Sequence, residues 1–139
     1  MKTKLLLPVL FLAFFCDPML LNAQKTPEPN AVKVIYFHGN NRCTTCNNME
    51  KYTRELLEED YAQEMKKGKL VFEVYNFDEE SSAGIVAKYK IESSTLLIIS
   101  LKKGKEKVTD LTDIGFTYAK YQEEQFKEAV AKKLNEVMR

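Results

Sequence analysis

The sequence predicts an α/β protein: a three-layer sandwich around a mixed four-stranded sheet, with the element order βαβαββα. Apolar runs of strand length alternate with segments of helical periodicity, which is typical of α/β proteins. A short polar turn at Gly104 joins the last two runs and leaves no room for a helix between them. The 139 residues suffice for one domain, and 45% hydrophobic with 29% charged residues indicates a globular chain.

The N-terminal segment differs in character from the rest of the chain. Two lysines precede the apolar run 5–15, which is shorter than the roughly 20 residues of a membrane-spanning helix. A basic start, a short apolar core and the small residue Ala23 are typical of a secretory signal peptide. We therefore expect residues 1–23 to be cleaved and the protein to be exported to the periplasm. A lipoprotein signal with lipid on Cys16 is the alternative.

The first half of the domain follows a short lead-in. Residues 24–31 contain two prolines and should be extended, and the domain proper covers residues 32–139. Residues 32–37 are almost continuously apolar, which is typical of a strand covered on both faces. Helical spacing of apolar residues then begins at Thr44 and should end or bend before the basic residues and glycine at 66–68.

The second half repeats this alternation. Buried strands are predicted at 70–75 and 95–99, with a shorter helix at 79–89 between them. An edge strand at 107–111 follows the turn at Gly104. Because helices connect the first three strands, we expect those strands to be parallel and the fourth to be antiparallel. The core stripe of the last helix should consist of Phe126, Val130, Leu134 and Val137.

Two cysteines with C-x-x-C spacing stand where the first strand gives way to the first helix. This is the carboxyl end of a strand, where open α/β sheets place their sites. Unpaired N–H groups at the helix start should lower the pKa of Cys43, and the positive charge of Arg42 should add to this effect. Cys46, one turn further along, should be more buried and act as the resolving thiol. A disulfide in so short a loop stabilises a fold only weakly, so a redox role is favoured.

Other roles for the pair stay open at the level of sequence. A structural zinc site needs four ligands, and the mature chain adds only His38 to the two thiols. A thiol site for copper or trivalent arsenic needs fewer ligands and is the main alternative, a binding module without turnover. An adaptor with an incidental C-x-x-C is a third hypothesis. His38 and Arg42 could equally be a loop-edge imidazole and a solvated charge. Nucleic-acid binding is excluded, since the net charge is +1 and no basic stripe occurs.

The pattern resembles the thioredoxin superfamily over essentially the whole mature chain. This resemblance implies a thiol–disulfide oxidoreductase in which Cys43 attacks and Cys46 resolves. The redox-active disulfide would then serve without a further cofactor or metal. The residues that carry the resemblance, besides the C-x-x-C, are Asn76-Phe77-Asp78, Lys88-Tyr89-Lys90-Ile91 and Thr95-Leu96-Leu97-Ile98.

A narrower resemblance rests on residues around the dithiol. The arrangement of His38-Gly39, Arg42-Cys43, Thr45-Cys46 and Glu50 is similar to a small exported thioredoxin-like family. That family is described as a subunit of nitrophenyl-compound nitroreductase and is associated with aromatic arsenicals. It implies a membrane-linked protein redox partner and the reduction of nitro-aromatic or arsenical compounds.

Three departures from the thioredoxin pattern bear on the site. Ser94 stands just before Thr95, where most relatives have a cis-proline, and a cis bond before serine would cost about 3 kcal/mol. We therefore expect a trans bond and a more open, less shielded dithiol. Arg42 replaces the usual tryptophan. The buried acid and lysine of the thioredoxin proton relay are missing, since the matching positions are near Tyr36 and at Val74.

Overall fold

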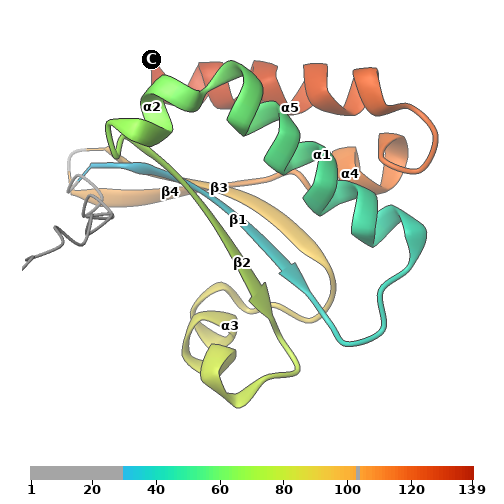
Figure 1. Cartoon of the computed structure of the whole chain (residues 1–139). Coiled ribbons are helices and arrows are strands. Elements are labelled where there is room, and N and C mark those ends of the chain that lie inside the picture. The colour runs from blue at the N-terminus through green and yellow to red at the C-terminus, as the bar shows by residue number, and fades with distance from the viewer. Residues whose placement is uncertain (1–29, 103) are drawn as a thin grey trace, which may run out of the picture.

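The computed structural model describes residues 30–102 and 104–139, so the predicted signal peptide, the lipid site at Cys16 and most of the lead-in lie outside the described residues. A central sheet carries helices on both faces (Figure 1). A 3₁₀ turn, η1, precedes the third helix. The elements in chain order are β1 (Val32–His38), α1 (Thr44–Asp60), α2 (Ala62–Lys66), β2 (Leu70–Asn76), η1 (Glu80–Ser82), α3 (Ala83–Tyr89), β3 (Thr95–Lys102), β4 (Lys105–Asp110), α4 (Thr112–Tyr118) and α5 (Glu123–Met138).

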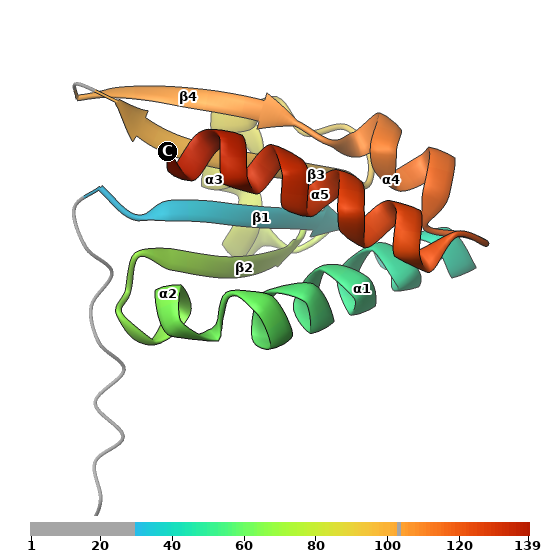
Figure 2. The same cartoon turned by 90° about the horizontal axis from the view of Figure 1, so that it is seen from above.

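The four strands form one mixed sheet in the order β2-β1-β3-β4. β1 and β2 are parallel, whereas β3 is antiparallel to β1 and β4 is antiparallel to β3. Helices α1, α2, α4 and α5 cover one face of the sheet, and α3 lies alone on the other (Figures 1 and 2). The predicted three-layer α/β sandwich with a mixed four-stranded sheet is confirmed.

The expectation that the first three strands are parallel is wrong for β3. β2 ends at Asn76, which is paired with His38, and β3 starts at Thr95, which is paired with Phe37. The connection from β2 to β3 therefore leaves and re-enters the sheet at the same end, next to the carboxyl end of β1. A seven-residue helix such as α3 advances about 10 Å, and a seven-residue strand spans about 23 Å. α3 is too short to carry the chain back along the sheet, so β3 must run the opposite way.

β1 lies at the centre of two apolar layers, which confirms that it is covered on both faces. Val34 and Tyr36 belong to a core cluster with residues of α1, α4–α5 and β3. Ile35 and Phe37 point to the other face and pack against residues of α3. All four side chains are at most 1% exposed. Alternation of side chains along a strand explains why a strand between two layers reads as continuously apolar.

The first predicted helix forms and bends, as expected. It breaks at Tyr61 into α1 and α2. The chain then leaves α2 through Gly68, whose φ of +74° is readily adopted only by glycine. Amide groups of Gly68 and Lys69 donate to carbonyl groups of α2, which closes the helix end. Among the described residues, no helix combines the length and the apolar character needed to cross a membrane.

Two differences from the predicted elements lie in the C-terminal half. β4 begins at Lys105, two residues before the predicted start, because hairpin pairing continues up to the turn at Gly104. Helix α4 was not predicted at all. It is short, contains Gly115 and lacks a side-chain N-cap, so its sequence gives no clear helical signal. Gly115 lies against Met49 of α1, which places α4 beside the start of α1.

Candidate active site

Cys43 and Cys46 face each other at the N-terminus of α1. Cys43 is the N-cap residue, and its Sγ atom accepts a hydrogen bond of 3.2 Å from the Cys46 N–H group. The two sulfur atoms are 2.6 Å apart. Cys43 is exposed and Cys46 is only 6% exposed, which confirms the predicted difference in burial. The pair can therefore interconvert between dithiol and disulfide without a rearrangement of the backbone.

Hydrogen bonds lower the pKa of the Cys43 thiol. The largest cause is the hydrogen bond from the Cys46 side chain, followed by the one from the Cys46 backbone N–H group. Slight burial acts in the opposite direction, and the Thr45 N–H group contributes a further small lowering. A thiolate at the start of a helix accepts hydrogen bonds from N–H groups that have no partner within the helix, and these bonds stabilise the charged form. The N–H contributions are the helix-start effect expected from the sequence, and the Cys46 side chain lowers the pKa further.

Ser94 and Thr95 complete the site from the start of β3. The Ser94 hydroxyl lies 3.6 Å from the Cys46 sulfur, so this side chain faces the dithiol. The peptide bond before Ser94 is trans, as are all peptide bonds between described residues. The Thr95 hydroxyl donates to the Ser93 carbonyl at 2.8 Å, which stabilises the turn that presents Ser94.

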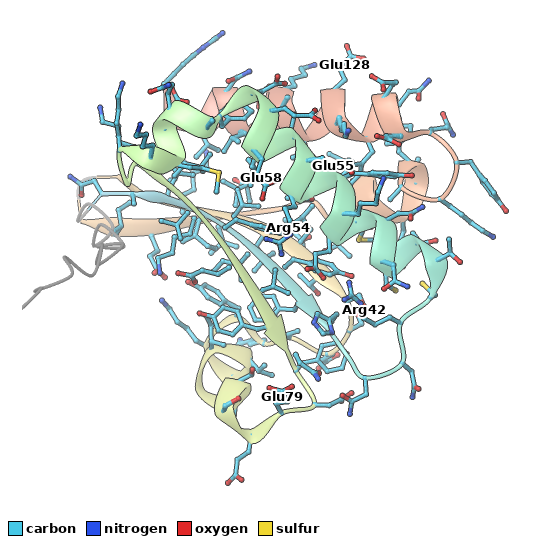
Figure 3. All side chains as sticks on the ribbon, viewed as in Figure 1. Arg42, Arg54, Glu55, Glu58, Glu79 and Glu128 are labelled. Carbon is cyan, nitrogen blue, oxygen red and sulfur yellow. The ribbon has the colours of Figure 1, made fainter. Side chains whose placement is uncertain are left out.

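The Arg42 side chain contacts residues of α1 and β1 next to the dithiol. Its guanidinium forms an ion pair of 2.7 Å with Glu50 and lies 3.4 Å from the Cys46 carbonyl oxygen. Burial alone would raise the pKa of Glu50, but hydrogen bonds from Arg54 and Arg42 hold it below its ordinary value. In Figure 3 both arginines lie along the edge of α1 that faces β2. The charge of Arg42 is thus paired with Glu50, and the predicted effect of this charge on the Cys43 thiolate stays a prediction.

Tyr36 lies beneath the dithiol, a contact that the sequence did not reveal. Its side chain is fully buried, and its hydroxyl donates to the Cys46 carbonyl oxygen at 2.8 Å. Burial raises the pKa of Tyr36 to about 12, and the nearby Cys46 charge adds to the rise. Arg42 stacks over the ring at 5.8 Å from its centroid. A neutral phenol therefore ties β1 to the first turn of α1.

The loop before Cys43 is fastened to the end of β2. Gly39 lies so close to Phe77 that a β-carbon would approach the ring to 2.8 Å. The Asn40 N–H group donates to the Asp78 carboxylate at 2.7 Å, and the Asn76 side chain donates to that of Asn40 at 2.8 Å. These contacts explain the joint occurrence of His-Gly-Asn and Asn-Phe-Asp in the sequence.

His38 is half-buried at the edge of this loop. Its Nδ1 atom lies 3.0 Å from the Gly39 carbonyl oxygen, to which it donates when protonated. Its ring centroid is 6.1 Å from that of Tyr36, so the imidazole borders the site from the β1 side. Within the described part of the chain, no group of three or more His, Cys, Asp or Glu side chains is placed to hold a metal ion.

A second segment that sequence reasoning missed borders Cys43. The turn after α4 is fixed to α1 by a 2.8 Å hydrogen bond from the Asn48 amide to the Ala119 carbonyl oxygen. The next residue, Lys120, has its pKa raised by a hydrogen bond to Tyr121 and by the Tyr121 charge, and the Cys43 charge contributes further. Lys120 thus supplies positive charge near Cys43, beside the 82% exposed Tyr121 side chain. No local motif marks this turn, because tertiary packing alone brings it to the dithiol.

Comparisons with known proteins give the following similarities. No protein-family model and no curated protein match the chain. Among solved structures, it is similar to one described as "Structure of a malarial protein", with a TM-score of 0.41 and 20% identity over 58% of this chain and 81% of that chain. It is also similar to a thioredoxin from Thermus thermophilus, with a TM-score of 0.37 and 14% identity over 57% of this chain and 58% of the thioredoxin.

The fold is thioredoxin-like. Its strand order β2-β1-β3-β4 is that of the thioredoxin sheet, and the C-x-x-C pair opens the helix that follows β1. Cys43 and Cys46 form a close pair, consistent with a thiol redox function.

Proposed function

We propose that the protein is a thiol–disulfide oxidoreductase that works through Cys43 and Cys46. One observation carries the proposal: an exposed N-cap thiol with a lowered pKa lies in contact with a buried second thiol one turn along the same helix. The exposed thiolate is the better nucleophile and leaving group, and the buried one is reached only from within the pair. Cys43 is thus the attacking thiol and Cys46 the resolving thiol.

The exchange balances in electrons and atoms. The Cys43 thiolate attacks one sulfur of a partner disulfide, forms a mixed disulfide and releases a partner thiolate. Cys46 then loses its proton and attacks the Cys43 sulfur. The Cys43–Cys46 disulfide closes, and the second partner thiolate leaves. Two electrons pass to the partner, and the reverse sequence oxidises a partner dithiol.

Trapping the mixed disulfide tests this assignment. Cys46→Ala should hold the physiological partner on Cys43, because the resolving step is removed. Cys43→Ala is the matched control and should trap little, since Cys46 is buried. Equal trapping by both variants would contradict the roles. The wild-type protein should also lose and regain two hydrogens by mass spectrometry when it is oxidised with glutathione disulfide and reduced again.

The cellular setting proposed for this chemistry comes from the sequence. A cleaved segment 1–23 would place the protein in the periplasm. The narrower resemblance suggests a membrane-linked redox partner and reduction of nitro-aromatic or arsenical compounds. Cell fractionation with mass measurement of the mature N-terminus tests export, and a lipid-modified Cys16 would show the alternative signal. Loss of nitro-aromatic reduction in a strain that carries only the Cys43→Ala form would support the substrate proposal.

A soft-metal or arsenic carrier is the second candidate, favoured by Ser94. In place of a proline ring, a small hydroxyl stands 3.6 Å from the Cys46 sulfur, and a serine shields the thiols less than a proline ring would. Two thiolates are ligands that trivalent arsenic and monovalent copper prefer. Calorimetric titration of the reduced protein should then show tight binding that Ser94→Pro weakens. Absence of binding by the wild type rules out the carrier, and binding unchanged by the substitution rules out the role of Ser94.

A further inference from the structure

Ser100 carries a buried hydroxyl that lacks a hydrogen-bond partner. The residue is 3% exposed, and its Oγ atom has no partner among the residues that the structure describes. A buried hydroxyl without a hydrogen bond costs about 1–3 kcal/mol, so native proteins rarely leave one unused. Such a hydroxyl is free to form a hydrogen bond with a molecule from outside the chain.

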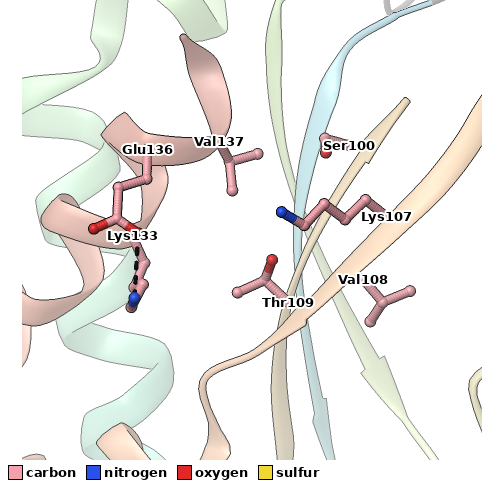
Figure 4. A pocket seen from close by; sticks show the side chains of 7 residues that line it. All are labelled: Ser100, Lys107, Val108, Thr109, Lys133, Glu136 and Val137. Atoms are coloured by element: carbon pink, nitrogen blue, oxygen red, sulfur yellow. Dashed lines mark hydrogen bonds and ion pairs between the residues drawn. The ribbon is translucent and has the colours of Figure 1, made fainter. Parts of the chain in front are cut away.

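The hydroxyl lines a cavity of about 260 Å³ between the β3–β4 hairpin and the last turns of α5. Ser100 is paired with Lys107 across the two strands, so both side chains point to the same face of the sheet. Figure 4 shows that the Ser100 hydroxyl, the Lys107 ammonium and the Thr109 hydroxyl converge on this space. All three groups can donate hydrogen bonds.

Charge and apolar surface in the cavity select the kind of ligand. Lys133 is engaged by Glu136 at 3.2 Å, whereas no ion pair involves Lys107 within residues 30–102 and 104–139. Val137 of α5 supplies an apolar wall. A lysine and two hydroxyls suit an oxyanion, and the valine suits a hydrocarbon body. The volume lies slightly below that of sites for drug-sized ligands, about 300–1,000 Å³, so the ligand is smaller.

We propose that this cavity binds a small organic monocarboxylate, with its carboxylate on Ser100, Lys107 and Thr109. The site is separate from the dithiol. β3 begins beside Cys46 at Ser94 and Thr95, and Ser100 lies five residues further along the strand, about 17 Å away. Binding there is thus independent of the redox state of the cysteines.

Titration of the isotope-labelled protein with benzoate tests the proposal. Binding is followed by NMR through the chemical shifts of the backbone amide signals. Saturable shifts should appear at Ser100, Lys107, Thr109 and Val137 and should be the same with reduced and oxidised cysteines. Lys107→Gln and Ser100→Ala should each weaken binding about tenfold, the loss typical of a hydrogen bond to a charged group. Lys132→Gln is the matched control: it removes an exposed lysine of α5 that does not line the cavity, and it should leave affinity unchanged.

Two further probes separate the parts of the proposal. Benzamide lacks the charge, and inorganic phosphate lacks the hydrocarbon body, so both should bind at least tenfold more weakly than benzoate. Equal binding of benzamide would overturn the anion site, and equal binding of phosphate would overturn the role of Val137. No shifts with benzoate, or shifts unchanged in both Lys107→Gln and Ser100→Ala, would overturn the site itself. Thermal unfolding of each variant checks that the fold is intact.

Discussion

Cys43 and Cys46 are chemically unequal although they lie one turn apart. Cys43 is exposed and accepts hydrogen bonds from the Cys46 thiol and N–H group. Cys46 is buried above Tyr36 and beside Ser94. Sequence position alone predicts this inequality, because an N-cap side chain projects from the helix end and a residue three positions later points back toward the sheet.

We expect limiting iodoacetamide at neutral pH to alkylate Cys43 well before Cys46 in the reduced protein. The reason is that Cys43 combines exposure with a lowered pKa, and the thiolate is the reactive form. Peptide mass spectrometry at short times measures the order. Labelling in urea is the control, where both cysteines should react at similar rates. Faster labelling of Cys46 in the folded protein would contradict the assignment of the nucleophile.

Tyr36→Phe should destabilise the reduced protein by about 1–3 kcal/mol. The substitution keeps the buried ring but removes the hydroxyl that donates to the Cys46 carbonyl oxygen at 2.8 Å. Urea unfolding measures the free energy. Tyr121→Phe is the control, because its side chain is 82% exposed and the change should stay within about 0.5 kcal/mol. Equal stability of wild type and Tyr36→Phe would mean that this hydrogen bond contributes nothing.

At the scale of elements, α4 connects the sheet to the dithiol. It follows β4 directly, and the Thr112 hydroxyl accepts a hydrogen bond from the Leu96 N–H group at the start of β3. Gly115 lets the helix approach Met49 in α1, and the turn after α4 bonds to Asn48. Helix α4 thereby places Lys120 near Cys43.

Gly115→Ala should lower the free energy of unfolding by about 1–3 kcal/mol, the usual cost of overpacking. An added β-carbon would lie 2.6 Å from the Met49 sulfur and methyl group, and Met49 is fully buried. Gly84→Ala is the matched control in α3: nothing lies within 4 Å of its added β-carbon, so it should stabilise the protein by up to about 1 kcal/mol. Urea unfolding compares the two. A neutral Gly115→Ala would show that Met49 moves aside freely.

For the whole molecule, folding and ionisation of the dithiol are linked. The folded state lowers the pKa of Cys43 below its ordinary value of 9.0, so it favours the thiolate more than the unfolded chain does. Stability from this source is fully present above the unfolded pKa and is lost as the pH falls through the folded pKa. The reduced protein should therefore become more stable as the pH rises toward 9.

Chemical unfolding at several pH values checks this linkage. The free energy of unfolding of the reduced wild type should rise with pH relative to that of Cys43→Ser, which has no thiol at this position. In the oxidised protein neither cysteine titrates, so its free energy of unfolding should depend on pH in the same way as that of Cys43→Ser. Parallel curves for the reduced wild type and Cys43→Ser would contradict a lowered pKa.

The sequence by itself determined the local features of this protein. Strands covered on both faces read as continuous apolar runs, so β1 and its two layers were predictable from residues 32–37. The start of α1 and the pair Cys43 and Cys46 follow from spacing and helix capping, which act within one or two turns. Ser94 was identified by resemblance, and its place beside Cys46 agrees.

Tertiary structure alone decided the features that depend on distant segments. The direction of β3 follows from the length of α3 and from the end of the sheet at which the chain re-enters it. The periodicity of apolar residues does not predict whether a strand runs parallel or antiparallel to its neighbour. Arg42, which precedes α1, forms an ion pair with Glu50 in the second turn of that helix, a contact that depends on how the loop meets the helix. Tyr36 bonds to the Cys46 carbonyl oxygen through the packing of β1, and the packing of α4 brings the Lys120 charge within range of the Cys43 charge; neither leaves a local pattern in the sequence. Local rules fix what each segment becomes, whereas the shared core fixes which segments meet.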